Sequence, residues 1–417
     1  MRRIYLVRHG LPEKSTSEKV YIGVTDLPLS TRGSVEASQL GSYFLQLIQT
    51  VNAVGRTDRT FAMNRIWQDI AGVESRMDVE QQAKLKCSDG PLAPTVRILT
   101  SPLQRCRQTA EEIYRVLSDG GIKLPEPLVI EALHEINLGE WEGKSVREIR
   151  ERFPEAYEAR GRALGTYHTP GGESFLEAGV RFQKAIEAYL PDLDESESLL
   201  IVAHAGVIRA YLSLLMGRDL DHLMDIPLPY ASITELLLNS EGTCVVTDCI
   251  GVRPEELLDE AEIARLYQKY QTPARVIHHM RKVAEVADQL MDGIPMPGLN
   301  RVRVMKACLL HDLCRAEKEH ARVSAEAIRK EGYPAIAALV AGHHEAAYSE
   351  REAQGPLTEA EILFYADKRV QEDVLVSVEE RFRESRKKCR SPEACAKHDA
   401  MLAKTLKIEK KILKNRR

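Results

Sequence analysis

Short apolar runs alternate with amphipathic stretches over roughly the first 250 residues. Residues 4–7, residues 199–203 and the stretch that ends at Thr100 are unbroken or nearly unbroken apolar runs. Such a run predicts a strand in the middle of a parallel sheet, covered on both faces. After about residue 255 the apolar positions recur with helical spacing and no run predicts a strand. The pattern therefore predicts an α/β domain followed by an all-α domain.

The length of the chain agrees with this division. It has 417 residues, and at ~150 residues per domain we expect two or three domains. The pattern changes near Arg253 and Pro254. We predict a first domain, a second domain and a basic C-terminal tail at residues 1–252, 255–390 and 391–417.

Two segments depart from the regular pattern. Residues 50–94 interrupt the alternation and predict an insertion, which forms either a lid or an extended surface loop. From Arg381 to Arg417, 14 Lys and Arg stand against 4 Asp and Glu. This end is either a solvated, partly helical tail or an arm that contacts anions.

Charge, apolar runs and cysteine spacing limit the binding partners and the cellular location that we expect for the protein. The formal net charge of -4 provides no general attraction to nucleic acid or to a membrane surface. No stretch reaches the ~20 apolar residues of a membrane span, and the first strand begins too early to leave room for a signal peptide. The eight cysteines form no CxxC pair, which is typical of reduced thiols. We therefore expect a cytoplasmic protein without a membrane or a specific nucleic-acid partner.

Polar side chains follow the predicted strands where each strand ends. Because the carboxyl ends of parallel strands meet at one edge of a sheet, and ligands bind at that edge, we expect these side chains to converge. A further acidic side chain lies in a loop between predicted elements. The candidates are Arg8 and His9 after the first strand, Arg105 on the next helix, His204 after residues 199–203, and Glu135 in the loop.

This set of side chains suits phosphoryl transfer to histidine. Guanidinium groups and protonated imidazole hold a phosphoryl group through charge-assisted bonds, without a metal ion. One imidazole nitrogen can attack phosphorus and form a covalent intermediate. A carboxylic acid must protonate the leaving oxygen and then take a proton from water, and Glu135 suits that role.

Five motifs in series carry a family resemblance over about residues 1–250. They read, in order, "RHG", "TSPLQRCRQTAE", "LHEINLGEWEG", "PGGES" and "VAHAGVIRA". They resemble the histidine phosphatase (phosphoglycerate mutase-like) superfamily, and the spelling of the third and fourth is similar to its α-ribazole phosphatase-like branch. The resemblance implies a three-layer α/β/α domain without a cofactor, acting on a small phosphorylated metabolite. It implies that His9 is the phosphorylated nucleophile, that Arg8, Arg105 and His204 bind phosphate, and that Glu135 is the general acid.

The first domain also departs from that family. Leu11 and Pro12 stand where members commonly have Glu-Thr, and Ile22 stands where a polar residue often contacts substrate. The alternative for this domain is a protein-phosphohistidine phosphatase that acts on a signalling partner.

Histidines of the second domain fall on apolar helix faces. His279 shares a face with Val276 and Val283, so it points inward, whereas His278 lies among charged residues. By the same criterion His343 follows an apolar helix face and is a candidate for an inward position. Its neighbour His344 is the less favoured candidate of the two. Histidines that point into a core are candidate metal ligands.

Carboxylates accompany these histidines on inward faces. Asp312 follows His311 at the end of an apolar helix, and Asp367 lies in a helix that opens with a capping box of Thr358 and Glu361. An unpaired buried carboxylate is costly, so it requires a cation. The predicted metal ligands are His279, His311, Asp312 and Asp367, with His320 and His343 for a second ion.

A second resemblance covers about residues 263–375. "HxxxVA", "LLHDLCR", "EHARVSA", "GHHE" and "YADK" resemble the HD superfamily of metal-dependent phosphohydrolases. The resemblance implies a divalent metal (Mn, Fe, Co, Zn or Mg) that polarises a phosphate ester and activates water. "HDLCR" departs from the frequent HD-Ile-Ala-Lys form.

The two resemblances together predict a bifunctional phosphohydrolase. The fusion suggests successive steps on one metabolite or nucleotide, in which the second domain opens a phosphodiester and the first clears the monoester. The alternative makes the second domain a nucleotide-sensing module with little turnover.

Overall fold

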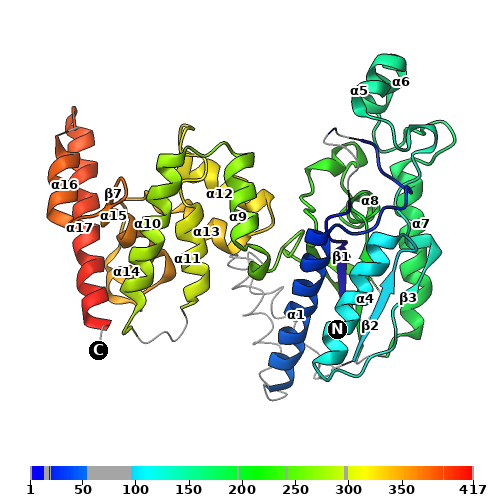
Figure 1. The fold of residues 1–417 in the computed structure, drawn as a ribbon, viewed down its shortest axis with the longest axis horizontal. Coiled ribbons are helices and arrows are strands. Elements are labelled where there is room, and N and C mark those ends of the chain that lie inside the picture. Colours follow the sequence, from blue (N-terminus) through cyan, green and yellow to red (C-terminus); the bar gives the residue numbers. More distant parts are fainter. Residues whose placement is uncertain are drawn as a thin grey trace. The chain divides into compact units, whose positions relative to one another are not determined.

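The structure is a computed structural model with two compact units, Met1–Leu257 and Leu258–Arg417, drawn in Figure 1. Most of the predicted insertion at 50–94 lies outside the described residues, and its role stays a prediction. The described residues are 2–13, 18, 20–53, 95–194, 197–239, 243–294, 299–387 and 389–415.

The first unit is built on one mixed sheet with the strand order β3-β2-β4-β1-β5-β6. β1 pairs in parallel with β4 and antiparallel with β5, so the prediction of a purely parallel neighbourhood for β1 was wrong. Helices on both faces of the sheet nevertheless bury its side chains, which is why its apolar run is unbroken. The strands are β1 (Arg2–Arg8), β2 (Thr95–Thr100), β3 (Leu128–Val129), β4 (Glu197–Ala203), β5 (Ile233–Leu238) and β6 (Cys244–Val246).

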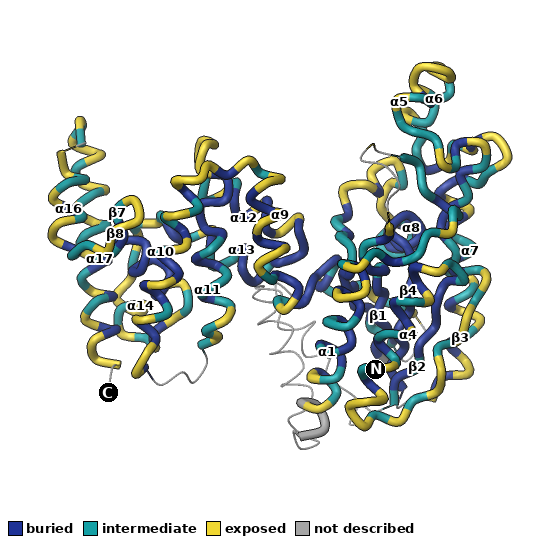
Figure 2. The backbone as a smooth tube through the Cα atoms, in the orientation of Figure 1, coloured by how far each residue is buried: buried dark blue, intermediate teal, exposed yellow. Residues whose placement is uncertain are grey.

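Helices cover both faces of this sheet and confirm the predicted three-layer α/β/α architecture. Ile4 and Leu6 face the core under α7 and α8, whereas Tyr5 contacts Phe44 of α1 with ring centroids 5.5 Å apart. Figure 2 shows the central strands β1 and β4 as largely buried tube segments, whereas the edge strand β3 is exposed. The helices are α1 (Thr31–Ala53), α4 (Gln104–Asp119), α5 (Val146–Arg152), α6 (Pro154–Arg162), α7 (Phe175–Tyr189) and α8 (Ala205–Leu215). Short 3-10 turns connect them: η1 (Glu131–Leu133), η2 (Gly139–Trp141), η3 (Leu190–Asp192), η4 (Leu220–Asp225) and η5 (Glu255–Leu257).

The second unit is helical, as predicted, apart from a small hairpin of β7 (Val370–Gln371) and β8 (Val374–Leu375). Strands of two residues are too short to show an alternating pattern, so the sequence could not reveal them. The capping box of Thr358 and Glu361 is confirmed at the start of α15. The helices are α9 (Glu260–Lys269), α10 (Ala274–Met291), α11 (Arg301–Leu310), α12 (His320–Lys330), α13 (Pro334–Ala341), α14 (Glu350–Gln354), α15 (Glu359–Lys368), α16 (Val378–Arg386) and α17 (Pro392–Asn415).

The basic C-terminal segment forms helix α17, which packs on its own unit. Ile408 and Ile412 are buried, and the Lys411 ammonium donates to both carboxylate oxygens of Glu361, at 2.7 and 2.9 Å. Lys407 pairs with Glu350. Part of the positive charge of this segment is therefore neutralised within the second unit. Among the described residues, no helix has the length and apolar character needed to cross a bilayer.

Candidate active sites

The carboxyl ends of β1, β2 and β4 lie at one edge of the first sheet. Arg8 pairs in register with Ala203, and the His9 amide donates to the Ala203 carbonyl at 3.1 Å. The Ser101 amide donates to the Val202 carbonyl at 3.0 Å. This alignment brings His9 and His204 together, with ring centroids 5.1 Å apart in an edge-to-face arrangement.

His9 is held in one tautomer. Its Nδ1 lies 2.7 Å from the Gly10 carbonyl oxygen, so Nδ1 carries the proton and Nε2 keeps a lone pair. Burial, and then the positive charges of Arg105 and Arg8, hold the pKa of His9 well below its usual range. A buried, unprotonated imidazole with a free Nε2 can attack phosphorus.

Two guanidinium groups border this pair. Arg105 donates from Nη1 to the Thr25 carbonyl at 2.7 Å and from Nη2 to the Gly23 carbonyl at 2.8 Å. Arg8 donates to the Leu228 carbonyl, and its guanidinium carbon lies 3.7 Å from the centroid of the Tyr230 ring. Within the described ranges, neither arginine forms an ion pair with a carboxylate. Arg105 is buried and Arg8 is half-buried, and cations that lack a carboxylate partner in such surroundings favour the binding of an anion.

His204 has two neighbours that the sequence did not indicate. Its Nε2 lies 2.7 Å from Ser101 Oγ and 3.3 Å from Cys106 Sγ. Burial, then Arg105 and then His9, lower the pKa of His204 well below the usual value. Ser101 and Cys106 stand inside the motif "TSPLQRCRQTAE", but only the pairing of β2 with β4 brings them to His204.

Glu135 joins the loop before η2 to the first turn of α8. Its carboxylate accepts hydrogen bonds from the Ile136 amide at 2.9 Å, the Gly206 amide at 2.9 Å and the Val207 amide at 2.8 Å. A Cβ atom at Gly206 would lie 2.6 Å from Oε1 of Glu135, so any larger residue there would displace this carboxylate from its amide donors. The structure thus brings together all five predicted residues of the first unit: Arg8, His9, Arg105, Glu135 and His204.

In the second unit the six predicted ligands, together with His344, divide into two groups. In each group the candidate ligand atoms all lie within 4.8 Å of one another. The groups draw on α10, the turn after α11, the start of α12, the turn after α13, and α15. They are His279, His311 and Asp367, and Asp312, His320, His343 and His344.

Three imidazoles point Nε2 into this cluster because backbone carbonyls hold the other ring nitrogen. Nδ1 of His311 lies 2.8 Å from the Cys308 carbonyl oxygen, and Nδ1 of His343 lies 2.6 Å from that of Val340. Nδ1 of His279 is held in the same way, at 2.7 Å from a backbone carbonyl oxygen. Nε2 of His311 and of His343 is buried without a hydrogen-bond partner among the described residues. Fixed tautomers and unused buried nitrogens fit a metal ion.

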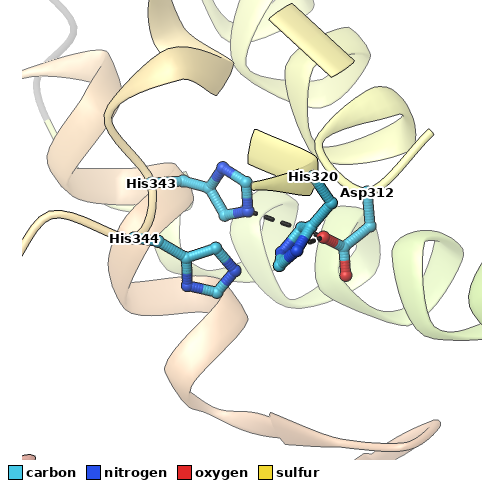
Figure 3. A group of neighbouring side chains, drawn as sticks. All are labelled: Asp312, His320, His343 and His344. Carbon is cyan, nitrogen blue, oxygen red and sulfur yellow. Dashed lines mark ion pairs between the residues drawn. The ribbon is translucent and has the colours of Figure 1, made fainter. Parts of the chain in front are cut away.

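Asp312 lies between the two groups. Its Oδ2 is 3.7 Å from Nε2 of His311, while its Oδ1 is 3.3 Å from Nε2 of His320 and 3.6 Å from Nε2 of His343. Figure 3 shows His320 and His343 directed at this carboxylate, with His344 beside them. Burial opposes ionisation of Asp312, but His343 and His311 lower its pKa below the usual value. Asp312 would therefore be within reach of a cation held by either group.

Comparison with known proteins decides the family. The model for the histidine phosphatase superfamily (branch 1) matches residues 4–86 and 80–248, more than half of the chain. The chain belongs to the histidine phosphatase superfamily. It is therefore a phosphoric ester hydrolase with a histidine phosphatase domain, and residues 276–370 match the HD domain model. HD domains are typically metal-dependent, and the two groups described above are possible metal sites.

Curated relatives of this histidine phosphatase are similar to part of the chain. The "Putative phosphoserine phosphatase 2" of Hydrogenobacter thermophilus is 27% identical over 248 residues, which cover 59% of this chain and 94% of the relative. The 6-phosphofructo-2-kinase/fructose-2,6-bisphosphatase of Arabidopsis thaliana is 30% identical over 146 residues, 35% of this chain but only 18% of the relative. Among solved structures, the alpha-ribazole phosphatase from Shigella flexneri is 23% identical with a TM-score of 0.40, covering 60% of this chain and 100% of that chain.

Two carboxylates of the histidine phosphatase domain escaped the sequence analysis. Glu142 accepts hydrogen bonds from the amides of Gly23, Val24 and Thr25, whose loop in turn supplies the carbonyls that hold Arg105. It stands in the motif "LHEINLGEWEG", yet nothing local marks it as the acceptor for a loop more than 100 residues away.

Glu36 is the other. It accepts the Leu11 amide at 2.8 Å, just beyond the "RHG" motif, and it pairs with buried Arg253 at 3.1 Å. The pattern of α1 alone predicts only a polar position on a helix.

The two groups of candidate ligands in the second unit are together called the HD cluster. The sequence analysis also did not predict the basic side chains beside this cluster. Arg315 donates to Nε2 of His320 at 2.6 Å, and Lys368 pairs with Asp367 at 2.5 Å. His344, the less favoured histidine of its pair, joins the second group, whereas His278 is exposed as predicted. These cations occupy acceptor atoms that a metal ion would use.

Proposed function

We propose that the histidine phosphatase domain is a phosphomonoesterase that forms a phosphohistidine intermediate on a small phosphorylated metabolite. The observation that carries this proposal is the pair of imidazoles, His9 and His204, bordered by two arginines that form no ion pair with a carboxylate of the described residues. A phosphoryl dianion would neutralise those two cations.

The side chains then have distinct roles. His9 Nε2 attacks phosphorus, and the bond to the ester oxygen breaks as protonated Glu135 gives that oxygen its proton. Arg8, Arg105 and His204 hold the phosphoryl oxygens through both steps. Ionised Glu135 next takes a proton from water, which attacks phosphohistidine and releases inorganic phosphate and free His9.

A His9→Ala variant tests this assignment. We expect phosphomonoesterase activity to fall by about a thousandfold or more, since the nucleophile acts as a unit with its partners. Labelled substrate, quenched in alkali, should leave acid-labile phosphate on the wild-type protein and none on the variant. His222→Ala, which changes an exposed histidine on η4, is the control. A His9→Ala protein with full activity contradicts the proposal.

A screen of phosphorylated metabolites addresses the substrate. Turnover of several small phosphomonoesters supports the metabolite phosphatase, whereas activity confined to phosphohistidine in proteins supports the alternative. We propose a cytoplasmic location for the protein as part of the same hypothesis.

For the HD domain we propose a metal-dependent phosphohydrolase. A bound divalent ion would polarise a phosphate ester and lower the pKa of water. His279, His311 and Asp367 would hold one ion, the group of His320 and His343 a second, and Asp312 would lie between them. The backbone carbonyls on the Nδ1 atoms keep each Nε2 lone pair available as a ligand.

Metal content together with hydrolysis separates this role from nucleotide sensing. Residues of the HD cluster should bind about one or two divalent ions per chain, and the loaded protein should hydrolyse a phosphodiester or nucleotide that the chelated protein does not. Bound metal without hydrolysis of nucleotides and cyclic dinucleotides supports the sensing module. Release of a monoester by the HD domain, followed by its dephosphorylation, would support successive steps.

A further inference from the structure

An ion pair at α7 lies next to the loop that carries Glu135. Glu173 stands in the motif "PGGES", just before α7, and Arg181 stands within that helix. Arg181 Nη2 donates to Oε1 of Glu173 at 2.7 Å, and its Nε donates to Oε2 at 3.3 Å. The two side chains are 20% and 19% exposed, so the pair is largely protected from water. A two-point contact of this kind fixes both the distance and the orientation of the two groups.

The same guanidinium group also binds backbone carbonyls of the loop. Nη1 donates to the Ala132 carbonyl at 2.6 Å and to the His134 carbonyl at 3.1 Å. Nη2 donates to the Glu135 carbonyl at 3.5 Å, and that oxygen also lies 2.7 Å from Nδ1 of His134. Arg181 therefore contacts three carbonyls that lie just before, and at, the residue proposed as general acid.

Glu173 holds the other end of the loop. Its Oε1 accepts the Asn137 amide at 3.0 Å, and its own amide donates to the Asn137 carbonyl at 2.9 Å. Residues 134–138 lie between the turns η1 and η2 and belong to no helix or strand, so these backbone groups depend on partners outside regular secondary structure. The Arg181–Glu173 pair therefore binds the backbone on both sides of Glu135.

The side chain of Glu135 has partners that cannot follow it if the loop moves. They are the amides of Ile136, Gly206 and Val207, and the last two lie in the first turn of α8. A displacement of the loop would separate the carboxylate from the α8 amides and from the ester oxygen beside His9. A misplacement of about 1 Å can lower a catalysed rate by about a hundredfold.

We propose that the Arg181–Glu173 pair positions Glu135 for proton transfer to the leaving oxygen. This inference rests on the proposed phosphomonoesterase function. Within the described ranges, Arg181 hydrogen-bonds only to the loop carbonyls and to Glu173, so it is a positioning residue and not a ligand of the phosphoryl group. Glu135 then gives its proton to the ester oxygen, and later takes one from water, at a place that α7 determines.

The leaving group distinguishes this role from a general role in stability. Arg181→Met should lower kcat/KM for glycerol 3-phosphate, whose leaving oxygen needs a proton, by about ten- to hundredfold. The same variant should lower kcat/KM for p-nitrophenyl phosphate by less than about threefold, because that leaving group needs no proton. Loss of folded protein would lower both values alike, and the melting temperature measures such a loss independently.

A double variant tests whether Arg181 acts through Glu135. In the Glu135→Gln background, adding Arg181→Met should lower kcat/KM for glycerol 3-phosphate by less than about threefold, because that background has no acid to position. Independent roles of the two residues would instead give the same loss as in the wild-type background.

Three further variants complete the test. Arg181→Lys keeps the charge opposite Glu173 but cannot span three carbonyls, so it should recover part of the activity. Glu173→Gln keeps an acceptor for the Asn137 amide and should give a smaller loss with the same dependence on the leaving group. Lys184→Met changes an exposed residue of α7 and should leave both kcat/KM values unchanged. If Arg181→Met does not fold, Arg181→Lys and Glu173→Gln are judged by the same comparison of substrates.

The results that overturn this inference differ from those that overturn the proposed function. An equal loss on both substrates, the full loss in the Glu135→Gln background, or no loss at all overturns the positioning role. If turnover still depends on His9 in those cases, the proposed phosphomonoesterase stands. If His9→Ala keeps full activity, the proposed function itself fails.

Discussion

The two candidate sites have opposite charge. In the first unit, two arginines that form no ion pair with any described carboxylate lie around two imidazoles, whereas in the second unit imidazoles lie around Asp312 and Asp367. The first is arranged for an anion and the second for a cation. In both, a backbone carbonyl on Nδ1 selects the tautomer, as for His9 and His311.

The same side chain therefore acquires different properties in the two units. Burial and two arginines lower the pKa of His9. Burial also lowers the pKa of His311, but the carboxylates of Asp367 and Asp312 outweigh burial, so the pKa of His311 is raised. The comparison teaches that the neighbouring charges, and not burial alone, decide in which direction the pKa of a buried histidine shifts.

The largest expected effect concerns Glu135 in the anion site. Glu135→Gln should lower kcat for an alkyl phosphate by about a hundredfold to ten-thousandfold, because an amide cannot protonate the leaving oxygen. The loss should be much smaller for p-nitrophenyl phosphate, whose leaving group needs no proton. Steady-state kinetics on both substrates measure this, with the melting temperature as a control for folding. An equal loss on both would assign Glu135 a structural role.

Metal loading should affect only the cation site. At a free metal concentration about a thousandfold above Kd, the ion should stabilise the second unit by about 4 kcal/mol, and chelation should remove this. Calorimetry with and without chelator measures the shift, and phosphomonoesterase activity should not change.

Two adjacent histidines sharpen the same test. His279→Ala should lower metal affinity by at least about tenfold, since it removes a ligand. His278→Ala, one residue away and exposed, should leave affinity unchanged. Equal metal content of both variants, by elemental analysis, would remove His279 from the site.

The pH dependence should differ in sign between the sites. For His9 and His204 the folded pKa is lowered, so below about pH 6.5 the unfolded chain binds protons that the folded unit does not, and stability falls as pH falls. Each such histidine lowers the free energy of unfolding by about 1.4 kcal/mol for every pH unit below that point. In chelated protein, His311 should titrate above its usual value, so its contribution is lost as pH rises through that raised pKa. Imidazole NMR titrations measure both, and His9 and His311 titrating alike would contradict the comparison.

The smallest effect concerns Ser101, which holds His204. Ser101→Ala should reduce kcat/KM by about threefold to tenfold, the value of one net hydrogen bond. Ser118→Ala, at an exposed position of α4, is the control. A change under twofold in the first variant would show that Cys106 and burial suffice to orient His204.

The sequence by itself determined the features that depend on local order. Unbroken apolar runs placed Arg8, His9 and His204 at strand ends, and helical periodicity separated inward His279 from outward His278. In a strand or a helix, the spacing of residues along the chain fixes which face each side chain lies on. The apolar spacing was therefore enough to predict the α/β and the all-α architecture.

Only the tertiary structure decided which distant groups meet. It brought Glu142 to the loop that holds Arg105, and it placed Asp312 between two groups of ligands. It also left Arg8 and Arg105 without an ion pair to a carboxylate within the described ranges. The physical reason is that charge pairing and hydrogen bonding depend on distance in space, and periodicity along a chain carries no information about partners a hundred residues away.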